Sequence, residues 1–148
     1  MRVSGKGLIN RQNKVNFKFD GVNYTGYEGD SVASALLASG KKLFGRSFKY
    51  HRPRGVLTAG SEEPNALITV GEGSFQDPNV RATTQEIFEG LVTRSQNNWP
   101  NLSYDVLSIN DLFSHFLGAG FYYKTFMWPK AFWEKIYEPF IRRAAGLG

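Results

Sequence analysis

Residues 15–40, VNFKFDGVNYTGYEGDSVASALLASG, contain the pattern that decides the fold of this chain. Apolar and polar residues alternate over 15–19, as they do in a strand that buries one face. The Asp20-Gly21 dipeptide that follows is typical of a tight turn, and residues 22–27 supply a second strand. The pattern therefore predicts a β-hairpin.

A short helix is expected directly after the hairpin, over residues 31–39. Asp30 or Ser31 can cap its N-terminus by accepting hydrogen bonds from the first free N–H groups. Gly40 supplies the left-handed residue at which such a helix ends. The apolar residues that fall on one face of this helix and its flank are Val32, Ala33, Ala35, Leu36 and Leu37.

Beyond the helix, the sequence predicts short strands separated by turns. Residues 58–65 have turn chemistry throughout. A sheet interrupted by one helix is typical of an α+β domain, which we place at residues 1–96. The further strands are expected to begin at Val56-Leu57 and to span 66–70, 79–84 and 87–94.

The character of the chain changes after residue 96, and residues 97–148 are expected to form a partly helical extension. A short helix is predicted over 109–117, with Asn110 or Ser108 as its N-cap. Because the C-terminal end shows no closing element, we expect the chain to be the N-terminal part of a larger subunit.

Aromatic residues are concentrated in the second half of this extension. Pro129 suits the first position of a helix, and Pro139 should kink or restart that helix. Phe132, Ile136 and Phe140 would share one helical face. Some of the rings are expected to pack on the sheet and the others on another domain or subunit. The rings are Phe121, Tyr122, Tyr123, Phe126, Trp128, Phe132, Trp133, Tyr137 and Phe140.

The excess positive charge lies in one segment. The sequence has 18 Lys and Arg against 13 Asp and Glu, a net charge of +5. Residues 41–54 contain six of the basic residues and no acid, which leaves 12 basic and 13 acidic residues elsewhere. Because aromatic rings alternate with these charges, the segment suits phosphates or nucleic acid. The alternative interpretation is a solvated surface loop.

The residue types that the sequence lacks exclude several kinds of chemistry. There is no cysteine, which excludes disulfides, thiolate metal sites, cysteine-ligated clusters and a cysteine nucleophile. His51 and His115 are the only histidines, so a His-rich metal site is not expected. Glu62 and Glu63 lie in the turn-rich segment, where solvation is expected rather than acid–base chemistry. The sequence thus predicts no catalytic residue and no metal site.

The sequence also indicates a location. Neither the apolar region of a signal peptide nor a run of about 18 apolar residues is present. We therefore expect a soluble cytoplasmic protein that makes no membrane contact.

Six stretches of the chain have an unusual composition. They are GRSFKYHRPRG (45–55), AGSEEPNAL (59–67), NVRAT (79–83), SQNNWP (95–100), FYYKTFMWP (121–129) and YEPFIRR (137–143). In this order they resemble the N-terminal domain of the sarcosine oxidase α subunit of the heterotetrameric bacterial type. The resemblance implies a β-grasp fold of the [2Fe–2S] ferredoxin kind, followed by an extension that leads to a dinucleotide-binding domain.

The same resemblance indicates which positions of this chain correspond to the cluster-ligating cysteines of ferredoxins. Plant-type ferredoxins hold a [2Fe–2S] cluster with the spacing C-x₄-C-x₂-C and a fourth cysteine later. Alignment on the Arg-Gly-apolar-apolar run at 54–57 puts Thr58, Glu63 and Ala66 at the first three positions and Thr83 at the fourth. Because none of the four supplies a thiolate, the resemblance implies a ferredoxin-like scaffold that has lost its cluster.

The resemblance further implies the setting in which the chain works. Enzymes of this family oxidise sarcosine to glycine, with formaldehyde or methylene-tetrahydrofolate and hydrogen peroxide as the other products. They carry FAD in the β subunit, FMN at the α/β interface, NAD in the α subunit and zinc in the smallest subunit. None of these centres matches a motif in the chain. The implied role is a structural and docking domain, with the rest of the α subunit and the β, γ and δ subunits as partners.

Within such a complex, the basic segment is the candidate cofactor-binding surface. Arg46, Lys49, His51, Arg52 and Arg54 would face a flavin or NAD phosphate or an acidic partner surface. Alternatively, these residues only neutralise acids inside the complex. His51 is expected to be neutral and hydrogen-bonded.

Two functions of other classes stay open at this point. One is a stand-alone nucleic-acid-binding module, which the basic segment permits although no recognised motif is present. The other is an electron-transfer ferredoxin, which the absence of cysteine disfavours.

Overall fold

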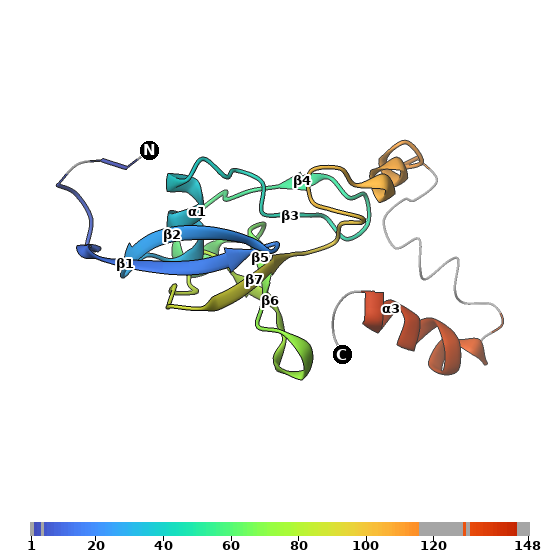
Figure 1. Cartoon of the computed structure of the whole chain (residues 1–148). Helices are drawn as coiled ribbons and strands as arrows, with labels where there is room; N and C mark the ends of the chain where they lie inside the picture. Colours follow the sequence, from blue (N-terminus) through green and yellow to red (C-terminus); the bar gives the residue numbers. More distant parts are fainter. Residues whose placement is uncertain (1, 4, 116–128, 130, 145–148) are drawn as a thin grey trace.

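The fold is built on a five-stranded sheet with one helix packed against it. The computed structural model describes residues 2–3, 5–115, 129 and 131–144 (Figure 1). The strands and helices are β1 (Asn10–Phe19), β2 (Val22–Glu28), α1 (Val32–Ala38), β3 (Gly45–Arg46), β4 (Pro53–Arg54), β5 (Leu67–Val70), β6 (Asp77–Arg81), β7 (Leu91–Ser95) and α3 (Glu138–Ala144). Short 3₁₀ helices span Gly60–Glu62, Gly73–Phe75 and Val106–Asp111, and a π-helical turn spans Trp133–Tyr137.

The large sheet is mixed and has the strand order β2-β1-β7-β5-β6. β1 is antiparallel to β2 and parallel to β7, with Phe17 opposite Leu91. β5 is antiparallel to both β7 and β6. A separate small sheet pairs β3 with β4. The mixture of strands and helix agrees with the expected α+β class.

The predicted hairpin and helix are both confirmed. Asp20 and Gly21 join β1 to β2 with positive φ angles of 51° and 77°, a turn geometry that matches the twist of the paired strands. At the start of α1, the Ser31 hydroxyl accepts a hydrogen bond from the Ser34 N–H at 3.2 Å. Gly40, with a φ of 84°, follows the C-terminus of the helix.

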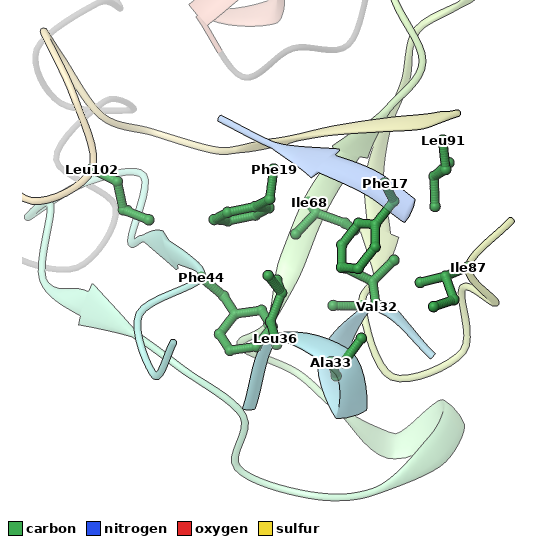
Figure 2. Packing of buried hydrophobic residues seen from close by; sticks show 13 residues of the cluster. Phe17, Phe19, Val32, Ala33, Leu36, Phe44, Ile68, Ile87, Leu91 and Leu102 are labelled. Carbon is green, nitrogen blue, oxygen red and sulfur yellow. The ribbon is translucent and has the colours of Figure 1, made fainter. Parts of the chain in front are cut away.

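The core lies between α1 and the sheet (Figure 2). Val32 and Leu36 on the helix face Phe17, Phe19 and neighbouring apolar residues of the sheet, as Figure 2 shows. Phe44 closes the core from the segment after α1, and its ring centroid lies 6.2 Å from that of Phe19. Burying each such side chain contributes about 1.5–3 kcal/mol, so this cluster supplies the main stabilisation of the domain.

The strand predictions after α1 need correction. Residues 56–57 do not begin a strand. The short strand lies earlier, at Pro53–Arg54, and the N–H of Leu57 donates to the side-chain carboxylate of Glu63 instead of to another strand. The strands expected over 79–84 and 87–94 lie at Asp77–Arg81 and Leu91–Ser95. The segment between these two strands bonds to the helix instead of to the sheet. The carbonyls of Gln85 and Ala82 accept hydrogen bonds from the N–H groups of Val32 and Ala33, which have no partner within α1.

The helix expected over 109–117 is wrong in its bounds, type and cap. The structure has a 3₁₀ helix at Val106–Asp111 instead, and residues 116–117 lie outside the described residues. The N-cap is Asp105, whose carboxylate accepts from the Leu107 N–H at 3.2 Å. Neither Asn110 nor Ser108 serves as the cap.

The C-terminal helix α3 restarts at Glu138, as Pro139 predicts. At the end of the preceding π turn, the Glu138 N–H donates to the Trp133 carbonyl. Pro139 lies in the first turn of α3, where backbone N–H groups form no hydrogen bond within the helix, so the lack of an N–H in proline costs no helical hydrogen bond. Of the predicted aromatic cluster, residues 121–126 and 128 lie outside the described residues. In the part of the chain that the structure describes, no helix is long and apolar enough to cross a membrane.

Candidate functional site

The loop between β4 and β5, residues 55–66, is the candidate site. It contains three of the four positions that align with cluster ligands. Gly55 permits a close backbone approach, since a Cβ at this position would collide with the Lys42 carbonyl oxygen. Gly60, with a φ of 66°, begins the 3₁₀ turn in the middle of the loop. These two glycines let the loop fold back on itself.

The carboxylate of Glu63 forms the centre of this loop. The residue is buried, with an exposed fraction of 1%. Its Oε2 accepts hydrogen bonds from the N–H groups of Leu57 at 2.7 Å and Thr58 at 2.6 Å. Its Oε1 accepts from the N–H groups of Asn65 at 2.7 Å and Ala66 at 3.1 Å. One carboxylate therefore satisfies four backbone donors from both arms of the loop.

These hydrogen bonds stabilise the ionised form of Glu63. Burial by itself would raise the pKa of the carboxyl group, because a low dielectric disfavours the charge. The backbone donors outweigh this effect and lower the pKa of Glu63 below its ordinary value of 4.5. Within the described ranges, Glu63 forms no ion pair, so peptide dipoles alone compensate its charge.

The structure brings the four predicted ligand positions together. Thr58 and Ala66 both donate their N–H groups to Glu63. The Thr83 hydroxyl donates to the Gly60 carbonyl at 2.6 Å, so the fourth position lies against the same loop. The four positions that the resemblance aligns with cluster ligands thus lie in or against one loop, although they are separated by up to 25 positions in the sequence.

The side chains at these positions do not fit a [2Fe–2S] cluster. Thr58 and Thr83 offer hydroxyl groups, and Ala66 offers no donor atom. Glu63 is the only anion among the four, and backbone N–H groups already occupy both of its oxygens. Iron–sulfur clusters need thiolate or imidazole ligands on each iron. In the described part of the chain, no group of three His, Cys, Asp or Glu residues could hold a metal ion either.

The expectation of a solvated Glu62-Glu63 pair is correct for Glu62 and wrong for Glu63. Glu62 is exposed, whereas Glu63 is fully buried in the loop. One signal could have separated the two residues: only Glu63 falls on a ligand position, and side chains at ligand positions point into the loop.

Two of the five basic candidates, Arg46 and His51, lie inside the fold. Arg46 Nη1 donates to the His51 carbonyl at 2.8 Å, and its Nε donates to the Leu102 carbonyl at 3.1 Å. His51 is buried, and its Nδ1 lies 2.8 Å from Asp105 Oδ2. The expected hydrogen bond of His51 is therefore present, with a partner 54 residues away.

Asp105, which the sequence did not single out, is the centre of this second polar cluster. Besides His51, its carboxylate lies 3.5 Å from the Arg46 Nε and accepts from the Trp99 N–H at 2.9 Å. The residue is buried, so its charge depends on these partners. No local pattern predicts its pairing with His51 and Arg46, which lie 54 and 59 positions earlier in the sequence.

The other three basic candidates lie nearer the surface. Lys49 Nζ lies 4.7 Å and the Arg52 guanidinium 4.6 Å from the centre of the Tyr50 ring. Arg52 also forms an ion pair with Asp111 at 2.7 Å, and both side chains are largely exposed. Arg54 is half-buried in β4. The five candidates therefore do not form one continuous phosphate-binding surface.

Residues 12–98 match the family described as "2Fe-2S iron-sulfur cluster binding domain". The sarcosine oxidase subunit alpha of Rhizobium meliloti (strain 1021) is 63% identical over 147 residues, which are 99% of this chain and 15% of that protein. The sarcosine oxidase subunit alpha of Corynebacterium sp. (strain U-96) is 45% identical over 86 residues, or 56% of this chain and 9% of that protein. The chain thus spans only a small part of these relatives.

Among solved structures, L-proline dehydrogenase from P. horikoshii is similar with a TM-score of 0.49 and 24% sequence identity. The similarity covers 65% of this chain and 18% of that one.

Proposed function

Because the chain belongs to the family of 2Fe-2S iron-sulfur cluster binding domains and has no cysteine, we propose that it is a structural and docking domain in the α subunit of a flavin-dependent sarcosine oxidase. The identity of 63% over 147 residues to a protein named sarcosine oxidase subunit alpha supports this assignment. The chain spans 15% of that relative, and in this proposal the oxidation of sarcosine is an activity of the whole assembly of which this domain is a part.

The observation that carries the docking role is an exposed apolar surface around the 3₁₀ helix Val106–Asp111. We call it the 104–113 surface. Leu112 is 80%, Phe113 53% and Ile109 51% exposed. A groove of about 520 Å³ runs along this segment. A contiguous apolar patch of this kind is typical of an interaction site. The large apolar members of the surface are Tyr104, Val106, Leu107, Ile109, Leu112 and Phe113.

The polar cluster of Asp105, His51 and Arg46 supports the same role. Asp105 begins the 3₁₀ helix and is bound to His51, which lies between β3 and β4. This link fixes the exposed segment to the folded domain. A rigid apolar surface loses less conformational entropy on association than a flexible one, which favours docking.

The organisation of the assembly is part of the proposal. Residues 1–96 form a cluster-free β-grasp domain, and residues 97–148 form the extension that meets the rest of the α subunit. FAD, FMN and NAD, together with the β, γ and δ subunits, belong to the cytoplasmic complex around it. Lys49, Arg52 and Arg54 would meet a cofactor phosphate or an acidic partner surface, whereas Arg46 and His51 support the fold.

The docking role is tested by co-expressing the tagged chain with the rest of the complex, followed by pull-down and an absorbance scan for bound flavin. We expect Leu112→Asp and Ile109→Asp to reduce recovery of the complex by about tenfold or more, because a charge would be buried at the interface. Leu8→Asp is the matched control, since Leu8 is a fully exposed apolar residue that precedes β1 and is not part of the 104–113 surface. The proposal is wrong if the wild-type chain recovers no partner, or if all three variants recover the complex equally.

A further inference from the structure

We propose that the Glu63 carboxylate is an internal anion that takes the place of an iron–sulfur cluster in organising the loop of residues 57–66. The loop is an anion-binding nest of backbone N–H groups, and its own side chain occupies it. When that side chain is removed, the nest should accept a small carboxylate such as acetate.

The first argument is the arrangement of the donors. The N–H groups of Leu57 and Thr58 come from one arm of the loop, and those of Asn65 and Ala66 come from the other. All four N–H groups donate to one carboxylate, although none of the four residues lies in a helix or a strand. Converging backbone N–H groups of this kind form an anion-binding concavity.

The second argument is the place of the anion. Glu63 occupies the second of the positions that align with cluster ligands, and Thr58 and Ala66, at the first and third, donate to it. Hydrogen bonds to the sulfurs of an iron–sulfur cluster are one of the means by which a protein sets the reduction potential of the cluster, so donors around such a site are common. The chain thus keeps a set of donors suited to an anion, while the thiolates that would bring iron are absent from its sequence.

The third argument is the manner in which the charge is compensated. In the described residues, each of the other buried carboxylates lies beside an arginine: Asp30 pairs with Arg2 at 2.6 Å, and Asp105 lies 3.5 Å from Arg46 as well as 2.8 Å from the His51 ring. Glu63 has no such partner there. This carboxylate is necessary to the loop, because without it four backbone donors lose their acceptor, and the N–H of Ala66, a buried residue, would be left without that partner.

The test is chemical rescue, measured by thermal unfolding of the full chain. Glu63→Ala removes the carboxylate and leaves space for acetate. We expect a lower melting temperature for Glu63→Ala than for the wild type, and a saturable increase of several degrees when sodium acetate replaces sodium chloride at equal ionic strength. Glu62→Ala is the matched control: the neighbouring side chain is exposed, so neither the loss nor the rescue should occur.

A second variant keeps the proposal testable if Glu63→Ala does not fold. Glu63→Gln has nearly the same size, but its amide N–H₂ faces two backbone N–H donors. We expect faster hydrogen exchange confined to the amides of Leu57, Thr58, Asn65 and Ala66. The proposal is overturned if acetate raises the melting temperatures of Glu63→Ala, Glu62→Ala and wild type equally. Unchanged exchange at these four amides in Glu63→Gln would also overturn it. Both experiments need no partner, so their outcome is independent of the docking test.

Discussion

At the scale of single residues, three buried carboxylates of the described chain are held in three different ways. Asp30 accepts from the Arg2 guanidinium, the Ser34 hydroxyl and the Tyr27 N–H. Asp105 lies between His51 and Arg46, and Glu63 uses backbone N–H groups alone. An unpaired buried charge is very costly, so each set of partners is required for folding.

Asp105→Asn should destabilise the domain by about 3 kcal/mol, because it removes the buried charge that His51 and Arg46 share. Urea unfolding at pH 7 measures the change, with an unchanged m-value if only stability is affected. Asp111→Asn is the matched control, since the Asp111–Arg52 pair is largely exposed and should contribute less than about 1 kcal/mol. Equal losses in the two variants would contradict the role assigned to Asp105.

At the scale of elements, the contact between β2 and α1 determines how closely the helix approaches the sheet. Gly26 is buried in β2. A Cβ added there would lie 2.9 Å from the Ala35 Cβ on α1 and would collide with the Ile87 side chain. The strand needs glycine at this position for space and not for its backbone freedom.

Gly26→Ala should therefore destabilise the domain by about 2 kcal/mol through overpacking. Thermal and urea unfolding measure the effect. Asn23→Ala, on the exposed side of the same strand, is the control and should change stability by less than about 0.5 kcal/mol. A Gly26→Ala variant as stable as the wild type would mean that α1 can move away from β2 without cost.

At the scale of the whole molecule, the fold combines a packed core between the sheet and α1 with the exposed apolar 104–113 surface, which follows β7 in the chain. Two of the buried carboxylates link terminal or loop segments to this core: Asp30 accepts from Arg2 and from Ser34 on α1, and Glu63 in the β4–β5 loop accepts from the core residue Ala66. Their ionisation therefore affects global unfolding and not only local structure.

The stability of the domain should fall in acid. The pKa values of Asp30 and Glu63 are both lowered in the folded state, from ordinary values of 3.8 and 4.5. For such groups, unfolding takes up protons at low pH, so their contribution is complete above the unfolded-state pKa and is lost as the pH falls through the folded-state pKa. The urea midpoint should therefore decrease below about pH 4.5, and less steeply in Glu63→Gln than in Glu62→Gln. A wild-type midpoint that stays constant between about pH 5 and pH 3 would contradict this expectation.

The sequence alone determined those features that depend on neighbouring residues. The hairpin around Asp20-Gly21 and the capped helix after Ser31 follow from alternation, turn chemistry and capping, which act over a few positions. The absence of cysteine means that this ferredoxin-like domain has no thiolate for a cluster, and the resemblance placed Thr58, Glu63 and Ala66 at the corresponding positions.

Only the tertiary structure decided the features that join distant residues. The parallel pairing of β1 with β7, the link from His51 to Asp105 across 54 positions, and the burial of Glu63 beside an exposed Glu62 have no local signature. The physical reason is the same in each case. A hydrogen bond or a buried charge depends on which groups the completed fold brings within about 3 Å, and a short-range pattern in the sequence does not contain this information.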